Sequence, residues 1–421
     1  MNDDHTEYGD LFRSMLSQSM QKALEILKQT KEYEMSSNSE ILEFKIGMIA
    51  PSRAGKTTLL NAIYHETSNM LIGKGISMKP SDKPTQTTIN EVLTTIENNL
   101  ASNVWEAPTV GGTGEVHWYK FAITIGTGSS MQKARVSILD YPGGYLGMED
   151  FDAEIAAYLN QCSVMLVPVS SDYLMLWKNT LGKTDKISRE KNKLASQALQ
   201  KKDVSDAIKE WQSFRKDATD DSVLIFVPVK CEIYFNDNGG HYDESKALLD
   251  TVEEYYRLDE LAKEPKIHVE IRAVDTYGIV EQKDEDMDLY TDDEGKKHLK
   301  SEFCRRHALG NEIKTLGAFN ILASVLDFHM NMHFLANALG MDEKQLKENL
   351  EKANSNLRDL IYKIENRWFK WFYEWFPSLD KDKAKAERLQ RNTFVLSKIL
   401  ELKKMQLNLP SRYRCIRSDN Q

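Results

Sequence analysis

The stretch Ala50-Pro-Ser-Arg-Ala-Gly-Lys-Thr57 decides the fold of this chain of 421 residues. It follows the apolar run of residues 41–50 and precedes a helical pattern that starts at Thr57. A tight loop between a strand and a helix can turn its backbone N–H groups toward phosphate oxygens. The loop also sets the ammonium of Lys56 against phosphate charge and offers the Thr57 hydroxyl to Mg²⁺. The stretch therefore predicts a phosphate-binding loop, with alanine at the position of the usual first glycine.

Outside this loop, the chain alternates between apolar β-type runs and helical patterns. Residues 163–169, 222–230 and 266–274 are short runs rich in β-branched residues, as in the buried strands of a parallel sheet. Residues 116–125 and 133–140 flank a Gly-rich and Ser-rich turn and predict a β-hairpin. The alternation predicts an α/β fold, with a doubly wound, mostly parallel sheet and helices on both faces.

The order of these patterns predicts three parts. Residues 1–40 form an amphipathic helix and a linker, residues 41–336 the α/β domain with its insertions, and residues 337–421 a helical region. Residues 67–92 are polar and contain glycines and prolines, so we expect a long mobile loop there. The acidic run of residues 283–295 lacks the Gly and Glu of an EF-hand at the required positions, so we expect a solvated loop.

Composition excludes several classes of protein. The 55 Lys and Arg residues against 64 Asp and Glu residues give a net charge of −9, so no global positive field attracts nucleic acid. The four cysteines are far apart and form no CxxC pair, which argues against a disulfide framework or a zinc module. The N-terminus does not resemble a signal peptide, and no apolar run reaches about 18 residues. We therefore expect a cytoplasmic protein with no specific nucleic-acid partner.

A second motif, Asp140-Tyr-Pro-Gly143, ends the apolar run of residues 133–140. Its carboxylate can join the shell of a Mg²⁺ ion, and the N–H of Gly143 can contact a γ-phosphate. Between the two motifs lies the segment Lys83-Pro-Thr-Gln-Thr-Thr-Ile-Asn-Glu91, which contains three threonines. The alternative is that these are a plain Asp-Pro-Gly turn and a Thr-rich loop.

Together these motifs resemble the translation-factor-related (TRAFAC) class of P-loop GTPases. In that class Asp-x-Pro-Gly is the usual third motif, and the second strand runs antiparallel to the third. The segment of residues 83–91 is similar to switch I of Era-like GTPases and to the Thr-Ile pair of Ras-like ones. The resemblance implies that Thr88, with Thr87 and Thr85 as alternatives, closes over Mg²⁺. It assigns the metal to Thr57, Thr88 and Asp140, and the phosphates to Ala54, Gly55, Lys56, Thr57 and Thr58.

Base recognition is implied by the sequence Val229-Lys-Cys-Glu232, which ends another apolar run. GTPases of this class carry Asn/Thr-Lys-x-Asp at this position. Lys230 would lie over the base and Glu232 would accept hydrogen bonds from guanine, although Val229 departs from the pattern. The resemblance favours guanine over adenine and adds a backbone contact from Ala273. The alternative is a strand end with two solvated charges.

Two positions bear on hydrolysis. Gly144 follows the Asp-x-x-Gly motif, so the water-orienting glutamine of Ras-like proteins is absent. Arg53 lies inside the phosphate-binding loop, as in guanylate-binding proteins and atlastins, where such an arginine acts as an internal finger. The alternative is an exposed loop cation. The sequence Ser52-Arg-Ala-Gly-Lys-Thr57 is also similar to the loops of bacterial YcjX-like and double-GTPase proteins, the latter from conflict systems.

The resemblance implies a Mg²⁺-dependent GTPase that acts as a nucleotide-dependent switch, in a defence or stress system. The catalytic residues would be Lys56, Arg53, Thr88 and Gly143. Alternatives are a nucleotide-binding module with little turnover and a small dynamin-like GTPase that contacts membranes. An aromatic segment around residues 368–376 would pack in the core, dock a protein partner or a second copy, or lie at a membrane.

Overall fold

The computed structural model describes residues 42–102, 117–125, 132–140, 153–216, 222–238, 244–264, 266–278, 280–283, 286–305, 314–325 and 405–416. The chain divides into two compact units. All of the described residues except Gln132 belong to the unit formed by residues 42–125, 133–325 and 405–421. The predicted division into residues 1–40, 41–336 and 337–421 stays a prediction.

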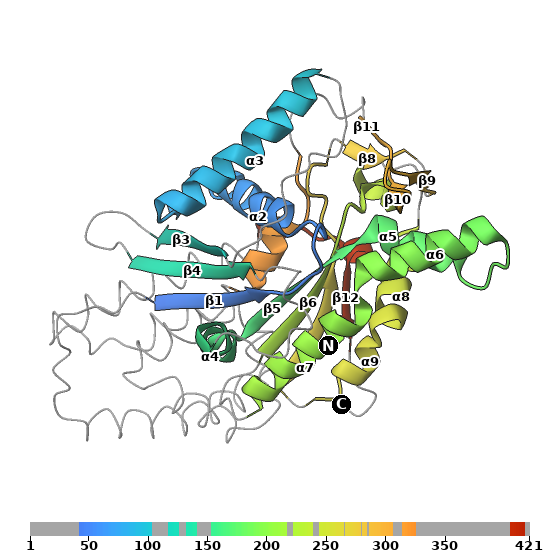
Figure 1. Ribbon diagram of the computed structural model, residues 1–421. Coiled ribbons are helices and arrows are strands. Elements are labelled where there is room, and N and C mark those ends of the chain that lie inside the picture. Colours follow the sequence, from blue (N-terminus) through green and yellow to red (C-terminus); the bar gives the residue numbers. More distant parts are fainter. Residues whose placement is uncertain are drawn as a thin grey trace, which may run out of the picture. The chain divides into compact units, whose positions relative to one another are not determined.

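An eight-stranded sheet in the order β12-β7-β6-β5-β1-β4-β3-β2 is the centre of this unit (Figure 1). The strand β1 pairs in parallel with β4 and β5, and the pairs β5–β6 and β6–β7 are parallel as well. The predicted α/β fold with a mostly parallel sheet is therefore confirmed. The strands are β1 (Leu42–Met48), β2 (Ile76–Pro80), β3 (His117–Ile125), β4 (Gln132–Asp140), β5 (Val164–Ser170), β6 (Ser222–Val229), β7 (Ile267–Arg272) and β12 (Tyr413–Ile416).

The two outer strands and one hairpin are the antiparallel parts of the sheet. At the edges, β2 pairs antiparallel with β3, and β12 pairs antiparallel with β7. The neighbours β3 and β4 are joined only by residues 126–131. A parallel connection needs a dozen or more residues, so β3 and β4 form the predicted antiparallel hairpin.

Helices cover both faces of the sheet (Figure 1). On one face lie α2, α3 and a helical stretch of residues 318–325, and on the other lie α4, α7, α8 and α9. The helices are α2 (Lys56–Met70), α3 (Lys83–Ser102), α4 (Ala153–Gln161), α5 (Ser171–Thr180), α6 (Lys186–Leu199), α7 (Lys201–Arg215), α8 (Ser245–Tyr256) and α9 (Leu258–Leu261). The doubly wound arrangement follows from the alternation of strands and helices along the chain.

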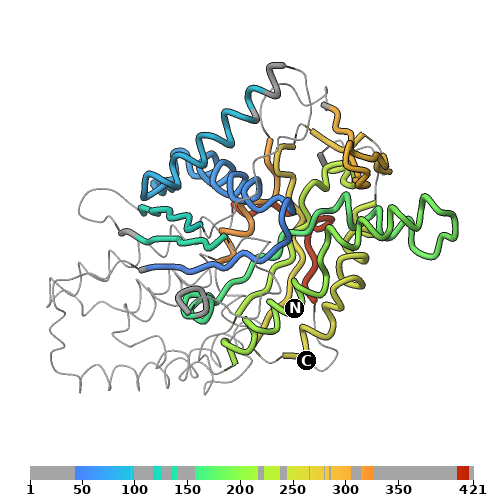
Figure 2. The backbone as a smooth tube through the Cα atoms, in the orientation of Figure 1, coloured from blue at the N-terminus to red at the C-terminus, as the bar shows by residue number. Residues whose placement is uncertain are grey.

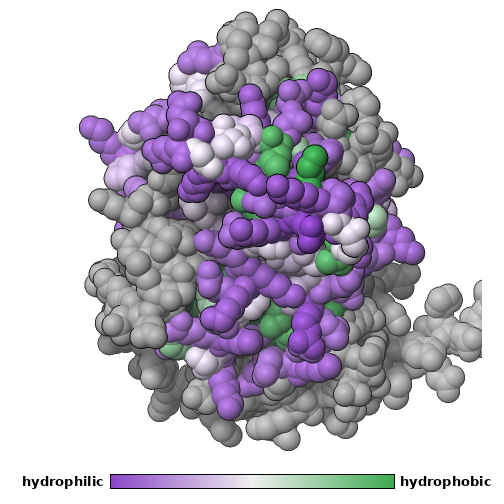
Figure 3. All heavy atoms as spheres, turned by 45° about the vertical axis from the view of Figure 1, so that its right-hand side comes forward, coloured by the Kyte–Doolittle hydropathy of each residue, from purple (hydrophilic) through white to green (hydrophobic). Residues whose placement is uncertain are grey.

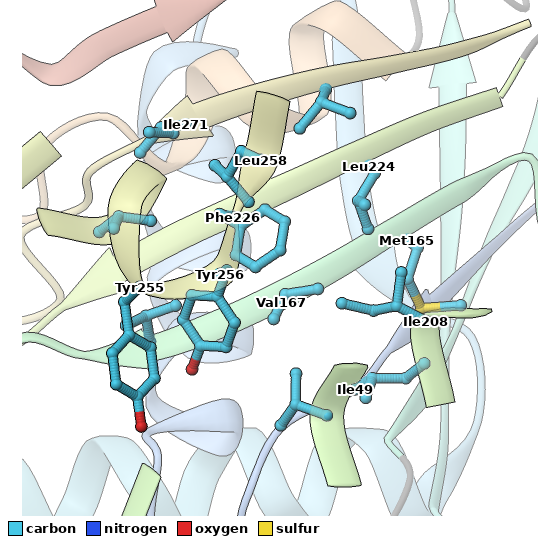
Figure 4. Close-up of a cluster of buried hydrophobic side chains, with 14 of the residues drawn as sticks. Ile49, Met165, Val167, Ile208, Leu224, Phe226, Tyr255, Tyr256, Leu258 and Ile271 are labelled. Carbon is cyan, nitrogen blue, oxygen red and sulfur yellow. The ribbon is translucent and has the colours of Figure 1, made fainter. Parts of the chain in front are cut away.

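Apolar side chains hold the helices of the second face against the sheet (Figure 4). Met165 and Val167 of β5 and Phe226 of β6 lie in a cluster with Ile208 of α7 and Tyr256 of α8, all of them buried. Each such side chain contributes about 1.5–3 kcal/mol when it is fully buried. The core therefore fixes the carboxyl ends of β5 and β6, where the polar side chains of the site begin.

The prediction of a long mobile loop at residues 67–92 is wrong. These residues form the end of α2, the strand β2 and the start of α3. Ile76 and Met78 alternate with more exposed residues along β2 and are buried. The Asp82 carboxylate accepts the N–H of Thr85 at 2.9 Å and caps α3. The glycines and prolines mark the boundaries of short elements here, and prolines are tolerated in the first turn of a helix.

Two further segments differ from the prediction. Residues 286–300 form a hairpin of β9 (Asp288–Thr291) and β10 (Lys297–Lys300), rather than a loop only. A second pair consists of β8 (Val280–Gln282) and β11 (Phe303–Arg305). The end of the predicted helical region forms β12, because its backbone completes the edge of the main sheet beside β7. Single short strands carry too little periodicity to be recognised in sequence.

Hydrophilic residues cover most of the described surface on one face of the molecule (Figure 3). The large hydrophobic side chains that are exposed in the described part are Ile72, Leu181, Ile187, Tyr290 and Tyr413. Among the described residues, no helix combines the length and the apolar character needed to cross a bilayer.

Candidate nucleotide-binding site

The predicted phosphate-binding loop lies between β1 and α2, the position expected from the sequence, and phosphate binding itself stays a prediction. The loop runs from Ile49 to Gly55, and α2 begins at Lys56. Gly55 has a φ of 95°, a left-handed conformation that disfavours residues with a side chain. A Cβ added to it would also lie 3.1 Å from Cγ2 of Val229, at the end of β6. Gly55 is therefore required both by the turn and by the close approach of the neighbouring strand.

The N-terminus of α2 is suited to bind an anion. The first four N–H groups of a helix have no acceptor within the helix, and together with the helix dipole they attract negative charge. The first turn of α2 contains no acidic residue, and Gly55 offers no side chain that could cap it. Thr57 and Thr58 in this turn are partly exposed, whereas Ala54, within the loop itself, is buried. Backbone amides and partly exposed hydroxyl groups thus occur together in this first turn.

Lys56 turns its ammonium back over the loop. Nζ donates to the carbonyl oxygens of Ala50 at 3.0 Å and Pro51 at 3.1 Å. The side chain is only 6% exposed. Burial lowers the pKa of Lys56, and the charge of Asp140 acts in the opposite direction. Lys56 is therefore a cation held in a poorly hydrated place, where a phosphate group would gain strongly from its charge.

Asp140 faces this lysine from the neighbouring strand. It ends β4, and in the parallel register it is level with Met48, the last residue of β1. The carboxylate is fully buried, and its charge acts on Lys56 and on the hydroxyl of Tyr119. Burial raises the pKa of Tyr119, Asp140 raises it further, and the hydroxyl groups of Thr57 and Thr88 lower it. Tyr119 therefore lies close to all three of the predicted metal ligands.

These oxygen donors fit a Mg²⁺ ion. Magnesium prefers oxygen ligands and is often bound through one or two carboxylates together with substrate phosphates. Asp140 supplies one carboxylate, and Thr57 and Thr88 supply hydroxyl groups that, like Asp140, act on Tyr119. Within the described residues there is no cluster of three or more His, Cys, Asp and Glu side chains that could hold a metal by itself. A metal here would therefore depend on the phosphates of the ligand.

Thr88 belongs to the first turns of α3 and not to a loop. Its hydroxyl donates to the carbonyl of Pro84 at 3.2 Å, within the helix. Thr85, one of the two alternatives, is fully buried, and its hydroxyl accepts the N–H of Lys120 at 3.0 Å. Thr85 therefore joins α3 to β3, which leaves Thr88 as the better placed of the two. Its role as a metal ligand stays a prediction.

Arg53 is exposed at the tip of the loop. Its φ of 62° is unusual for a residue with a side chain. Burial raises the pKa of Tyr173 to about 12, the charge of Asp172 adds to this, and Arg53 acts in the opposite direction. The guanidinium therefore lies near Tyr173, beside the loop, and is not buried in the core.

Lys230 follows β6 and also has a left-handed φ, of 53°. Its Nζ is 3.5 Å from Oδ2 of Asp172 and lies over the ring of Tyr173, 5.7 Å from the centroid. Asp172 is 1% exposed and also accepts hydrogen bonds from Ser170, at 2.5 Å, and from Ser301, at 3.3 Å. The side chain predicted to lie over a base is thus held by a buried carboxylate beside the phosphate-binding loop.

Glu232 is buried and connects two loops. Its Oε1 accepts the N–H of Thr276 at 3.0 Å and that of Tyr277 at 3.4 Å, in the loop after β7. The Thr58 hydroxyl in turn acts on the pKa of Tyr277, so this loop reaches the first turn of α2. Direct recognition of a base by its carboxylate stays a prediction.

Ala273 continues β7 toward the same edge of the sheet. Its N–H donates to the carbonyl of Arg412 at 2.9 Å, and the residue is buried. This amide is therefore engaged with the C-terminal segment. A base contact by Ala273 stays a prediction, and its N–H is not the group that would make it.

Four residues of the site region were missed in the sequence. Asp172 could have been found, because a carboxylate just past a buried strand at the carboxyl edge of a parallel sheet is a typical binding position. Tyr119, Glu66 and Arg412 carry no such signal. The Glu66 carboxylate of α2 accepts three N–H groups at the start of the helical stretch 318–325, at 2.7–3.2 Å. These contacts depend on residues that are far apart in the sequence.

Some predicted features lie outside the described residues. They include Gly143 and Gly144 after β4, the N-terminal residues 1–40 and the aromatic segment of residues 368–376. The predicted roles of these residues in catalysis, partner binding or membrane contact stay predictions.

No protein-family model matches the chain, and a search of curated proteins finds no match. Among solved structures, it is similar to the S. cerevisiae Ski7 GTPase-like domain bound to GDP and inorganic phosphate, at 13% identity and a TM-score of 0.29. This match covers 56% of the chain and 43% of that structure. Sup35 complexed with GDP gives 14% identity, a TM-score of 0.26, and coverage of 59% and 41%. The chain thus spans less than half of each, and the TM-scores are too low to bear on what it binds.

Proposed function

We propose that this protein binds GTP with Mg²⁺ and hydrolyses it to GDP and phosphate, as a nucleotide-dependent switch of the translation-factor-related GTPase class. The observation that carries the proposal is the buried pair of Lys56 and Asp140 at the phosphate-binding loop, with hydroxyl groups of Thr57 and Thr88 nearby. A lone Gly-Lys-Thr helix start would not need a carboxylate from the neighbouring strand at this depth.

The residues of the phosphate side have separate tasks in this proposal. The N–H groups at the start of α2 hold phosphate oxygens, and Lys56 exchanges two carbonyl partners for the β- and γ-phosphates. Thr57, Thr88 and Asp140 would hold Mg²⁺, which supplies neutralising charge for the phosphates when it is bound. Movement of Thr88 and of the residues after Asp140 would give the switch its two states.

The base side of the site, formed by the loop after β6 that carries Lys230 and Glu232 and by the loop after β7, supports guanine as the ligand. Lys230 is held by Asp172 beside the loop, where its stem can lie along a base, and Glu232 lies two residues later. Similarity of the loop to conflict-system GTPases supports a role in defence or stress. A protein partner or a second copy would contact the α/β domain or the aromatic segment.

A second candidate is a nucleotide-binding module with little turnover. It is favoured by the engagement of Glu232 with the amides of Thr276 and Tyr277, and by glycine in place of the water-orienting glutamine. In the GTPase proposal, Arg53 stabilises the transition state from its exposed position on the loop.

The test is to measure binding and multiple-turnover hydrolysis of GTP and ATP side by side, with and without Mg²⁺, over a range of protein concentrations. Mg²⁺-dependent turnover that is selective for GTP is the expected result. Tight binding without turnover would support the second candidate. A preference for ATP would refute guanine recognition but not the phosphate site, and failure to bind either nucleotide would refute both.

A further inference from the structure

The C-terminal residues 405–416 return to the main sheet and pass the base side of the site at Arg412, from which β12 runs back along β7. In Figure 2 this segment is the red trace, which runs along the yellow trace of β7. The register of β12 on β7 pairs Tyr413 with Arg272 and Ile416 with Val269. Asn320 also exchanges two hydrogen bonds with the backbone of Leu407, at 2.8 and 2.9 Å. The segment is thus a fixed part of the α/β unit.

Arg412 is the residue of this segment that reaches furthest inward, at 1% exposure. Its guanidinium donates to both oxygens of Asp237 at 2.7–3.1 Å and to both oxygens of Asp275, at 2.7 and 3.0 Å. Its flat face lies over the ring of Phe235, 4.0 Å from the centroid. An arginine presents five donors in a rigid fork, which suits two carboxylates better than a lysine would.

The two carboxylates belong to the two loops that form the base side. Asp237 lies in the loop after β6, which begins with Lys230 and Glu232. Asp275 lies in the loop after β7, directly before Thr276, and is fully buried. Apart from Glu232, Arg412 is therefore a second tie between these loops, and it comes from a segment distant in the sequence.

The charges in this cluster make the tie rigid. Burial by itself lowers the pKa of Arg412, but the charge of Asp275 and the hydrogen bonds of Asp237 and Asp275 raise it by more, so the residue stays ionised. A buried ion cluster is strongly destabilised when one partner is removed, because the remaining charges lose their compensation. The loops therefore have little freedom to move apart while Arg412 is in place.

We propose that Arg412 is a positioning residue for base recognition. Through Asp237 and Asp275, it sets the loops after β6 and β7 at the spacing at which Lys230 and Glu232 can hold a purine base. The inference rests on the proposed function and deepens it, because it makes the C-terminal segment a part of the nucleotide site. Arg412 itself lies too deep in the unit to serve as a surface ligand group.

The experiment compares the full chain with Arg412→Lys and with Arg414→Lys as the matched control. Arg414 belongs to β12, which follows Arg412 directly, but it binds Asp250 and Glu253 of α8, away from the base loops. Calorimetry gives the Kd of each protein for GTP and for inorganic tripolyphosphate, both with Mg²⁺, and the Tm is measured in parallel. Tripolyphosphate probes the phosphate side alone, whereas GTP probes both sides.

The expected result is a loss of about tenfold or more in GTP affinity for Arg412→Lys, with tripolyphosphate affinity unchanged and Arg414→Lys equal to wild type. Equal losses for both ligands, or none, would overturn the inference and leave Arg412 as a purely structural residue. If Arg412→Lys does not fold, Asp237→Asn takes its place, because the bonds between Arg412 and Asp275 remain. If the wild-type protein binds GTP no more tightly than tripolyphosphate, the proposed guanine site is refuted, and the inference is refuted with it.

Discussion

The phosphate side and the base side of the site are built in different ways. On the phosphate side, Lys56 contacts carbonyls only six and five residues away in the sequence. On the base side, Glu232 joins a loop 44 residues away, and Arg412 joins Asp237 across 175 residues. The first can be recognised as a motif, whereas the second exists only when the sheet has formed. Substitutions on the two sides should therefore differ in which ligands they affect.

The largest effect is expected from Arg53→Ala on catalysis. An internal arginine finger stabilises charge that develops on the γ-phosphate, so its removal should lower kcat by about 10³-fold. The Kd for GTP should change little, because the side chain is exposed on the loop. Arg257→Ala is a matched control, since Arg257 is also exposed and has a φ of 56°. Single-turnover hydrolysis at the wild-type rate would show that Arg53 is only a loop cation.

The next largest effect is expected from Lys56→Met on binding. Loss of the buried ammonium removes the charge that faces the phosphates, which should weaken binding by about 100-fold or more. GTP and tripolyphosphate should lose affinity alike, because the lysine belongs to the phosphate side. Calorimetry with Lys79→Met, an exposed lysine of β2, is the control. A loss for GTP alone would contradict the division into two sides.

A smaller and more selective effect is expected from Glu232→Gln. The amide oxygen can still accept the N–H groups of Thr276 and Tyr277, so the loops stay joined. The charged acceptor for guanine is lost, which should weaken GTP binding by about tenfold and leave tripolyphosphate unaffected. Glu270→Gln, on β7, is the control for the lost charge. Unchanged GTP affinity in Glu232→Gln would show that this residue only ties the loops.

The smallest effect is expected in the pH dependence of stability. Burial lowers the pKa of Lys56 below its usual 10.5, so in this range the folded state binds fewer protons than the unfolded state. The free energy of unfolding should therefore rise as the pH increases from the lowered pKa toward 10.5. Lys56→Met should lack this increase in denaturant titrations at several alkaline pH values. The same slope in both proteins would show that Lys56 is well hydrated.

Most of the residues proposed for the phosphate side could be named from the sequence because their chemistry is local. Gly55, Lys56 and Thr57 are adjacent, and Asp140 ends an apolar run whose strand character is plain. The position of Thr88 was harder, since the surrounding segment has the glycines and prolines of a loop. In the structure, pairing with β3 makes residues 76–80 the strand β2, and the Asp82 cap starts the helix α3. The secondary structure of this segment therefore depends on a capping residue and a partner strand, which its composition does not reveal.

On the base side, the contacts that hold the proposed site residues in place could not be predicted from the sequence. The resemblance predicts Lys230 and Glu232 as base contacts, but the sequence does not reveal that Glu232 holds the loop after β7 or that Asp172 holds Lys230. A buried carboxylate accepts whichever donors the fold brings to it, and any backbone amide can be such a donor.

By itself, the sequence determined the α/β class, the parallel core strands and the strand, loop and helix around Gly55, Lys56 and Thr57, because hydrophobic periodicity and a contiguous motif express them directly. Only the tertiary structure decided that Tyr413–Ile416 form the edge of the sheet and that Arg412 joins Asp237 and Asp275. The physical reason is that an edge strand is selected by an open row of backbone donors and acceptors. A buried charge is likewise selected by partners that meet only after the chain has folded.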